Sequence, residues 1–599
     1  MAAAAAGEKS LVDRCIDAAA RGAATVEAWR RQRRSLERLP AQLADALLRR
    51  LAARRLLFPS LLEVFQRSVE EVDLSGYVPV DAEWLAYIGS FRFLRVLKLA
   101  DCKNINNSAV WALSGMTTLK ELDLSRCSKI SDAGIKHLVT IESLEKLQLS
   151  ETGLTDNGVM AISSLTNLYF LDLGGVHMTD KALQSLQVLT RLEHLDIWGS
   201  ETTDKGASVL KTLTRLRFLN LSWTHVTSFQ VPPTLRCLNM SNCTIRSICG
   251  GDPEVPIALE NFVATAASFG NIDEVFSSIE ASSVSYLDMS GCSFGNLSFM
   301  EKMENLGHLD LSFSRINDDA IEHVAKIGTK LKYLSLKNTG ITSQALCVLA
   351  GTVPNLTSLS LGHTKIDDSA LVYISMMPLL RTIDLSHTSL KGFTQTEGTA
   401  AKLLSLSAFE HLKYLESLNL EDTPLSAEVI TPLASFRALK YLYLKSDFLS
   451  DPALHTLSSA SNLIHLGFCG NILSSSGLLQ FEPPPTLCML DLSGCWILTG
   501  DAISTFCGRH PMIEVKHEFM QNLKASRVGA SQLHKPRQSQ RGKAKVANSL
   551  AGSSRLPDIC FVDERIKYSK EEMMELQCLA KSHSAMHGLR LPPELQRIE

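Results

Sequence analysis

The sequence predicts a curved solenoid of the α/β class over most of its length. The segment 119–147 begins with leucines at alternate positions, Leu122 and Leu124, and continues with apolar residues three or four positions apart, such as Ile135 and Leu138. A period of two is typical of a strand, and a spacing of three or four is typical of a helix. Such a unit has one apolar side, which it can bury only against copies of itself.

Copies of this unit recur from roughly residue 70 to residue 515 at a nearly constant spacing. The position of Leu122, called the repeat leucine below, comes 25 residues after Leu97, and Leu195 follows Leu171 by 24. The period and the leucine pattern resemble the leucine-rich repeat, which implies a ribonuclease-inhibitor-like array with parallel strands on its concave face. The repeat leucines are Val72, Leu97, Leu122, Leu147, Leu171, Leu195, Leu219, Leu238, Leu287, Leu309, Leu334, Leu359, Ile383, Leu418, Leu442, Leu466 and Leu490.

The spacing of the repeats is irregular in the middle of the array. Leu238 follows Leu219 by only 19 residues, and Leu287 follows Leu238 by 49, which leaves room for two repeats. We therefore expect a degenerate repeat near Leu259 and Phe262, and a bend between two sub-arrays at this place.

A second irregularity is an insertion. Leu418 follows Ile383 by 35 residues, which is 11 more than a step of 24, and the surplus lies in 391–406. Insertions in a solenoid leave the stack as loops, often on the binding side. We therefore expect a protruding loop here.

The chain divides into six predicted segments. After the repeats, 524–555 carries basic residues and no acidic one, which indicates disorder, and a capping-box pattern at Ser569 predicts a short helix over 570–583. The segments are a helical docking or capping module (1–68), a first sub-array (69–245), degenerate repeats with a bend (246–286), a second sub-array (287–515), a basic disordered linker (516–557) and a C-terminal segment with the short helix (558–599).

The composition argues against several classes of function. The chain has 599 residues and a net charge of -3, which disfavours a globally basic nucleic-acid binder. A membrane span would need a run of about 18 apolar residues, which the sequence lacks, and we find no secretory signal. Without a phosphate-binding loop, a GxSxG or an HExxH motif, we expect neither an enzyme nor a cofactor.

The 14 cysteines fit the repeat better than a metal site. Five of them stand three residues after the leucine that follows the repeat leucine, where other repeats carry threonine. A small side chain with a polar tip can hydrogen-bond the backbone there. No CxxC pair is present, so we expect no metal, and free thiols favour the cytoplasm or the nucleus. The five are Cys102, Cys127, Cys243, Cys292 and Cys495.

Ser-Asp or Thr-Asp pairs open many of the helical segments, as at Thr155-Asp156 and Thr179-Asp180. A short acceptor side chain at this point can cap the first turn of a helix and complement its dipole. We therefore expect these pairs to be structural.

Two sets of side chains are candidates for binding a protein substrate on the concave face. The residue after the repeat leucine points to that face and is often acidic or an amide, as in Asp172, Asp196 and Asn220. It is either a consensus feature of the repeat or an acidic surface for a basic partner. The second set consists of large residues one or two positions beyond the next leucine: Trp198, Trp223, Phe313, His363 and His387.

Exposed tryptophan is typical of interface hot spots, so Trp198 and Trp223 are the main candidates of the second set. The alternative is that they pack against the neighbouring repeat.

The first 68 residues do not follow the repeat and read as helices. Apolar residues four positions apart share one helix face, and proline is tolerated in a first helical turn. These helices either cap the first repeat or dock another protein. The spaced residues are Leu11, Cys15 and Ala19 in the first helix, and Leu39, Pro40, Leu43 and Leu47 in a later one.

These residues resemble the docking motifs of ubiquitin-ligase receptors. The spacing Leu11-x3-Cys15-x3-Ala19 matches the elongin-binding box of von Hippel–Lindau-box receptors, and the motif that begins at Leu39-Pro40 matches their cullin box. With leucine-rich repeats behind them, the chain resembles the zygote-defective (Zyg) substrate receptors of cullin-RING ligases. The second motif also resembles the opening of an F-box, which binds a Skp-type adaptor and often precedes cysteine-containing leucine-rich repeats.

The resemblance implies a substrate-recognition subunit in ubiquitin-dependent degradation, with an elongin- or Skp-type adaptor, a cullin and a protein substrate as partners. Zyg receptors carry an armadillo-like array after their repeats, which this sequence does not show, so the leucine-rich repeats would have to read the substrate. The alternative is a leucine-rich-repeat scaffold or inhibitor-like protein with no ligase link. In neither case do we expect a membrane or a nucleic acid as partner.

Overall fold

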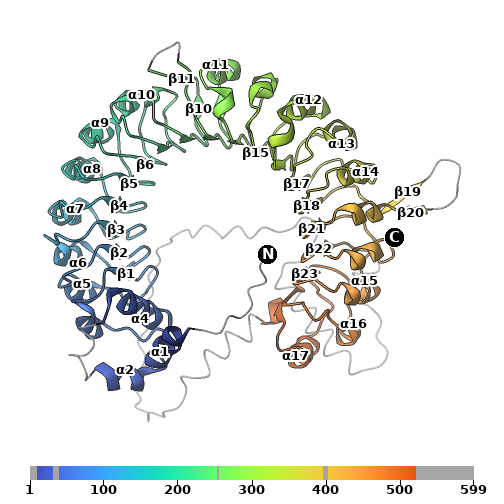
Figure 1. Cartoon of the computed structure of the whole chain (residues 1–599), viewed down its shortest axis with the longest axis horizontal. Coiled ribbons are helices and arrows are strands. Elements are labelled where there is room, and N and C mark those ends of the chain that lie inside the picture. Colours follow the sequence, from blue (N-terminus) through green and yellow to red (C-terminus); the bar gives the residue numbers. More distant parts are fainter. Residues whose placement is uncertain (1–9, 31–38, 252–254, 396–401, 521–599) are drawn as a thin grey trace, which may run out of the picture. The chain divides into compact units, whose positions relative to one another are not determined.

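The computed structural model describes residues 10–30, 39–251, 255–395 and 402–520. They form two compact units, divided between Ser335 and Leu336. Within each unit, short parallel strands lie side by side in one sheet, and the helices cover one face of this sheet, as Figure 1 shows. This confirms the predicted α/β solenoid of leucine-rich repeats with helices before it. The predicted C-terminal helix and all but residues 516–520 of the predicted linker lie outside the described residues.

Helices precede the first strand, as predicted. They are α1 (Leu11–Ala19), α2 (Ala23–Arg30), α4 (Ala41–Ala53) and the 3-10 helix η1 (Pro59–Phe65). Helix α4 buries Leu48 and Leu51 and packs against the first strand. The carboxylate of Asp45 in α4 accepts a hydrogen bond from the backbone N–H of Glu70 at 3.1 Å. The module therefore covers the apolar end of the first repeat.

The sheet of the first unit aligns the repeat leucines. Leu97 lies opposite Val72 on one side and Leu122 on the other, and the same register continues to Leu334. These side chains form a continuous buried row. The strands are β1 (Glu71–Asp73), β2 (Val96–Lys98), β3 (Glu121–Asp123), β4 (Lys146–Gln148), β5 (Phe170–Asp172), β6 (His194–Asp196), β7 (Phe218–Asn220), β9 (Cys237–Asn239), β12 (Asn261–Val263), β14 (Tyr286–Asp288), β15 (His308–Asp310) and β16 (Tyr333–Ser335).

The helical segments of the first unit are short because each has about ten residues to cross between neighbouring strands. The α-helices are α5 (Ala82–Ile88), α6 (Asn107–Val110), α7 (Asp132–Leu138), α8 (Asp156–Ile162), α9 (Asp180–Ser185), α10 (Asp204–Ala207), α11 (Ile272–Ser277) and α12 (Asp318–Ile327). The 3-10 helices are η2 (Trp111–Leu113), η3 (Leu186–Val188), η4 (Leu210–Thr212), η5 (Ala281–Ser283), η6 (Ser298–Lys302) and η7 (Gly328–Lys330). None of the helices among the described residues has the length and apolar content that a membrane crossing requires.

The predicted degenerate repeat is present, with Phe262 in place of a leucine. Phe262 lies opposite Leu238 and Leu287 in the sheet and is fully buried. The 19-residue repeat before it is too short for a helix, and an extended segment takes the helix's place. In this short repeat the segment is β8 (Ser228–Gln230), which pairs with β11 (Ser247–Cys249) of the following repeat. That repeat also contains β10 (Thr244–Ile245), which pairs with β13 (Ser268–Phe269).

The second unit continues the same pattern. Its strands are β17 (Ser358–Ser360), β18 (Thr382–Asp384), β21 (Ser417–Glu421), β22 (Tyr441–Lys445), β23 (His465–Gly467), β24 (Met489–Asp491) and β25 (Glu514–Lys516). Its helical segments are α13 (Ser343–Leu349), α14 (Ala370–Ser375), η8 (Ser405–His411), η9 (Thr431–Ser435), α15 (Asp451–Thr456), η10 (Leu457–Ser459), α16 (Ser475–Gln480) and α17 (Gly500–Arg509). The predicted insertion contains an antiparallel pair, β19 (Phe393–Gln395) with β20 (Lys402–Leu404), which protrudes from the unit in Figure 1.

The cysteines hydrogen-bond the backbone, as predicted, and they do so between repeats. The thiol of Cys127 donates to the carbonyl of Leu99 in the preceding repeat at 3.3 Å, whereas the hydroxyl of Thr152 donates to Leu149 of its own repeat at 2.7 Å. Burial raises the pKa of the Cys102 thiol to about 11 and that of Cys127 to about 12. Burial thus disfavours the thiolate, which is the reactive form of these side chains.

The Ser-Asp and Thr-Asp pairs are structural, as expected, but not all of them cap their own helices. Thr203 does so, because its hydroxyl accepts a hydrogen bond from the backbone N–H of Lys205 at 3.3 Å. Thr155 and Thr179 make no side-chain cap on their own helices. Instead, Thr179 donates its backbone N–H and its hydroxyl to the carboxylate of Asp156, one repeat earlier, at 2.7 and 2.6 Å. Thr203 makes the same two bonds to Asp180. The aspartate therefore joins neighbouring repeats because its two oxygens face the donors of the next repeat.

Candidate functional site

We call the residues that directly follow the repeat leucines the aspartate row. Aspartate and asparagine side chains of this row accept hydrogen bonds from the backbone of their own repeat. Asp172, Asp196 and Asn220 each accept a hydrogen bond from the backbone N–H two residues later, at 3.0, 3.1 and 3.0 Å. This is an Asx turn, which explains why the repeat favours aspartate or asparagine there. Asn220 is only 9% exposed and donates its amide to Asp196 at 3.1 Å. Little of the Asn220 side chain is therefore left for a partner.

The carboxylates of this row are partly removed from water. Burial raises the pKa of Asp172, and it raises the pKa of Asp196 to about 6. The hydrogen bonds from the turn and from Asn220 oppose this rise but do not cancel it. Asp172 and Asp196 are therefore less readily ionised than exposed aspartates, so the row is less acidic than the number of its carboxylates suggests.

In almost every repeat of both units, the residue four positions after the repeat leucine has a left-handed backbone conformation. Trp223 and Phe313 occupy such positions with φ of 60° and 58°. The backbone N–H of Trp223 donates to the carbonyl of Ser241 in the next repeat at 2.9 Å, so the turn belongs to the stack. We call these residues the left-handed row: Gly76, Asp101, Arg126, Glu151, Gly175, Gly199, Trp223, Asn242, Ala266, Gly291, Phe313, Asn338, His363, His387, Asp422, Gly470 and Gly494.

Trp223 and Phe313 expose their rings at these left-handed positions. Their side chains are 64% and 57% exposed. A large residue in this conformation costs roughly 1 kcal/mol or more compared with glycine. Exposed aromatic rings held on strained backbone are a feature of binding surfaces. Trp223 and Phe313 are thus the sequence-predicted contacts that the structure leaves open to a partner.

Trp198 lies differently from Trp223, because it packs against the preceding repeat. Its indole covers Gly174 and Gly175, and a Cβ atom at Gly175 would come within 3.1 Å of the indole ring. Trp198 is only half-exposed as a result. The packing role considered for the tryptophans therefore applies to Trp198.

His363 and His387 of the second unit lie side by side. Their rings stack at 3.8 Å, and the Nε2 atom of His387 lies 3.1 Å from the carboxylate of Asp422, which also pairs with Lys445 at 3.1 Å. Burial, followed by the neighbouring His387, lowers the pKa of His363. Among the described residues, no group of three or more His, Cys, Asp or Glu side chains has the arrangement of a metal site.

A row of aromatic rings on the strand face was not predicted from the sequence. It is formed by the residues immediately before the repeat leucines, called the aromatic row below. In the first unit His194 stacks between Phe170 and Phe218, with ring distances of 3.9 and 4.0 Å. Neighbouring strands are about 4.8 Å apart, so the rings converge and the strand face is concave here. The signal was present in the sequence as three aromatic residues at one repeat position.

A second stack of the same kind follows in the aromatic row. His308 lies between Tyr286 and Tyr333, with ring distances of 4.0 and 3.9 Å. Between the two stacks, β9 and β12 carry Cys237 and Asn261 in place of rings.

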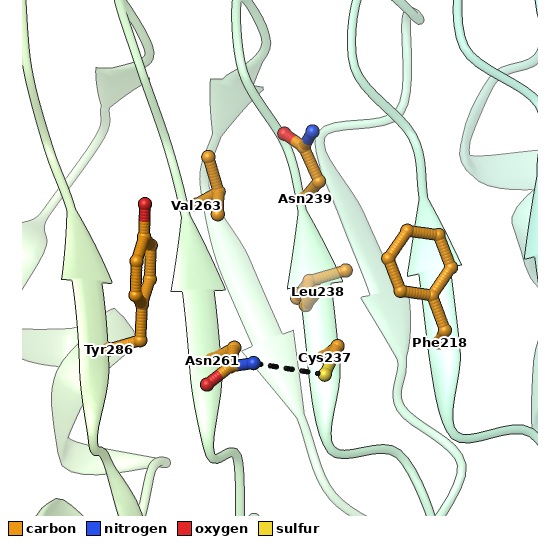
Figure 2. A pocket seen from close by; sticks show the side chains of 7 residues that line it. All are labelled: Phe218, Cys237, Leu238, Asn239, Asn261, Val263 and Tyr286. Carbon is orange, nitrogen blue, oxygen red and sulfur yellow. Dashed lines mark hydrogen bonds between the residues drawn. The ribbon is translucent and has the colours of Figure 1, made fainter. Parts of the chain in front are cut away.

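A hollow of about 250 Å³ opens where these two rings are missing. Figure 2 shows Phe218 on one side, Tyr286 on the other and Asn261 and Cys237 between them. The amide of Asn261 donates to the sulfur of Cys237 at 3.4 Å, so these side chains are held to each other. We call this hollow the aromatic slot; Leu238, Asn239 and Val263 complete its lining.

The predicted adaptor-binding residues of the first helix lie at the surface. Leu11 is 77% exposed, Cys15 is exposed and Ala19 is half-buried. Helix α1 is held from its other side by Asp17, whose carboxylate pairs with Arg50 at 2.9 Å and with Arg54 at 2.7 Å. Helix α1 is therefore held against α4 on one side and exposes apolar residues to solvent on the other.

The second predicted motif is only partly accessible. Pro40 is exposed, and Leu39 and Leu43 are half-buried. Leu47 is 5% exposed and belongs to the buried side of α4. We therefore correct the assignment of Leu47, since its side chain packs inside the module and offers no surface to an adaptor.

Comparison with known families identifies the type of repeat. The family described as leucine-rich repeat region matches residues 78–423. No curated protein sequence matches the chain.

Solved structures with a similar arrangement include an internalin from Listeria monocytogenes, a leucine-rich repeat protein from Leptospira interrogans and the plant peptide hormone receptor RGFR1 in complex with RGF2. The identities are 19%, 17% and 14%, with TM-scores of 0.31, 0.35 and 0.39. The matches cover 72%, 77% and 78% of this chain, and 94%, 92% and 86% of the other chains.

Proposed function

The chain belongs to the leucine-rich repeat family, and from this premise we propose that it is a protein-recruiting receptor. Helix α1 docks an adaptor of a cullin-RING ubiquitin ligase, and the strand face of the repeats holds the protein to be modified. Such a subunit needs no catalytic group of its own, because it acts by bringing a substrate close to a reacting centre.

The observation that carries this proposal is the exposed apolar edge of α1. Leu11 and Cys15 lie one helical turn apart and are both exposed, while Asp17 fixes the helix from the side of α4. Burial of a large aliphatic side chain that is 77% exposed would contribute favourably to the binding of a partner. Leu11 and Cys15 are also the residues at which the sequence resembles an elongin-binding box.

The geometry favours an elongin-type adaptor over a Skp-type one. The F-box resemblance begins at Leu39 and runs along α4, whose Leu47, Leu48 and Leu51 are buried in this chain. A Skp-type adaptor would find only Pro40 and parts of Leu39 and Leu43 at the surface. If the chain has no ligase link, all these helices serve only to cap the first repeat. The packing of α4 on the first strand also supports this alternative.

Binding of the purified full-length chain to purified adaptors tests the proposal. We expect an elongin-type adaptor to bind the wild type, and the double variant Leu11→Ala, Cys15→Ala to lose at least 10-fold in affinity. Val12→Ala is the matched control, since Val12 is a 48%-exposed apolar residue of the same helix outside the motif. Loss of binding only in Leu39→Ala, Pro40→Ala would favour the Skp-type adaptor, and no binding of either adaptor would leave the capping role.

A further inference from the structure

We propose that the aromatic slot binds the aromatic side chains of a protein segment that carries basic residues beside them. The inference rests on the proposed role of the strand face as a protein-binding surface, and it identifies the chemistry that this face reads. It is independent of which adaptor binds α1.

The first argument is the periodicity of the aromatic row. Rings follow one another at 3.9 to 4.0 Å in Phe170–His194–Phe218 and again in Tyr286–His308–Tyr333. Cys237 and Asn261 interrupt this order for two repeats. Phe218 ends one stack and Tyr286 begins the other, and both residues line the slot between the stacks.

The second argument is size. Three strand steps separate Phe218 from Tyr286, and at about 4.8 Å for each step their strands lie on the order of 14 Å apart. A cavity of about 150 Å³ is enough for benzene, and the slot measures about 250 Å³. The slot therefore has room for one indole or for two smaller rings, which would restore the stack between the two existing ones.

The third argument is that the walls suit a ring and the floor supplies polar groups. Phe218 and Tyr286 contribute aromatic rings, and Val263 and Leu238 add apolar surface. The amides of Asn239 and Asn261 belong to the same lining, and asparagine amides can donate to or accept from an indole N–H or a phenol O–H. Stacking of aromatic rings adds to the affinity beyond what the buried area alone contributes.

The fourth argument is charge, which decides between protein and nucleic acid. Asp288 stands beside the slot in the aspartate row, opposite Val263 in the sheet. The arginines near it are already paired, Arg236 with Glu260 at 3.6 Å and Arg217 with Glu193 at 3.9 Å. Carboxylates beside a stacking site repel the phosphates of a single-stranded nucleic acid and attract lysine or arginine.

Titration of two tripeptides into the purified full-length chain, followed by ligand-observed NMR, tests this inference. The probe is acetyl-Lys-Trp-Lys-amide, and the control is acetyl-Lys-Leu-Lys-amide, which has the same charge but no ring. We expect the tryptophan peptide to bind at least 10-fold more tightly than the leucine peptide. Equal binding of both peptides, or no binding of the tryptophan peptide, overturns the inference.

A filled slot provides the variant. Asn261→Tyr places a ring where the row lacks one, next to Tyr286, and we expect it to abolish binding of the tryptophan peptide while the chain stays folded. Val96→Tyr makes the same kind of change at the equivalent position of β2, and we expect its affinity to stay within 2-fold of the wild type. Unchanged affinity in Asn261→Tyr, or tighter binding of a 12-residue uridine oligonucleotide than of the peptide, contradicts the proposal.

The two proposals can fail separately. The adaptor experiment depends on Leu11 and Cys15, and Asn261→Tyr leaves that helix unchanged. An adaptor that binds Asn261→Tyr normally while the peptide does not bind supports both proposals. A tryptophan peptide that binds a chain without adaptor affinity supports the slot and removes the ligase role.

Discussion

The indole of Trp198 lies across Gly174, one repeat earlier, so closely that a methyl group on Gly174 would overlap the indole nitrogen. The next residue, Gly175, has φ of 69° and also lies under the ring. Trp198 thus fits its place because two small residues precede it by one repeat. This relationship separates Trp198, a packing residue, from Trp223, an exposed one.

Substitution of Gly174 by alanine tests the packing of Trp198. We expect Gly174→Ala to lower the free energy of unfolding by about 1–3 kcal/mol, because added volume in a packed site forces side chains off their preferred positions. In a Trp198→Ala background the same change should cost less than about 0.5 kcal/mol, since the ring is gone. Chemical denaturation of the four proteins gives the interaction energy. Additive effects would show that the ring does not rest on Gly174.

The strain at Trp223 predicts the opposite sign of effect. With φ of 60° and a 64%-exposed side chain, Trp223→Gly should raise the free energy of unfolding by about 0.5–1 kcal/mol, because glycine adopts this conformation without a steric cost. Trp111→Gly is the control, since Trp111 is 66% exposed but has φ of -53°. There we expect a loss of similar size. A loss of stability in Trp223→Gly would mean that the ring contributes packing.

His194 predicts a pH dependence of stability. Burial lowers the pKa of His194 to about 4 in the folded chain, with Lys146 as a further cause, whereas the unfolded value is about 6.5. Between these values the unfolded chain binds more protons, so stability falls as the pH falls from 6.5 to 4. His194→Phe keeps a ring between Phe170 and Phe218 and should remove about 1–2 kcal/mol of this fall, because His194 is only half-buried. Unfolding curves at pH 4, 5 and 7 measure it, and identical pH dependence of both proteins would contradict the assignment.

The bonds between repeats predict a large effect for an aspartate at the surface. The carboxylate of Asp180 accepts two hydrogen bonds from Thr203, at 2.7 Å each. Burial would raise the pKa of Asp180, but these bonds outweigh it and lower the pKa. We expect Asp180→Ala to cost about 1–3 kcal/mol of unfolding free energy, and exposed Lys181→Ala, the control next to it, to cost less than about 0.5 kcal/mol. Equal effects of the two variants would show that the hydrogen bonds between Asp180 and Thr203 do not stabilise the fold.

The repeat itself could be predicted from the sequence because the leucines carry it. Leu97, Leu122 and their equivalents are buried in register, and the spacing alone placed a degenerate repeat near Leu259 and Phe262. The roles of Thr155 and Thr179 were placed on the wrong partner, because a hydroxyl before a helix can bond either its own first turn or the neighbouring repeat. Only the stacked geometry decides between these two acceptors.

The candidate site was harder to predict than the fold. Trp223 was singled out because a tryptophan at a position of small residues stands out, whereas the aromatic slot lies where two residues, Cys237 and Asn261, carry no ring. A missing side chain has meaning only when the row beside it is known to stack. The burial of Leu47 also could not be read from its spacing, because the same four-residue period describes a docking face and a packed one.

The most direct test of the proposed function is recovery of the full-length chain from cells, with identification of the cullin and the adaptor that accompany it by mass spectrometry. We predict that the wild type and Val12→Ala bring an elongin-type adaptor and a cullin, and that Leu11→Ala, Cys15→Ala brings neither while remaining folded. A wild-type chain that recovers no adaptor and no cullin would contradict the account.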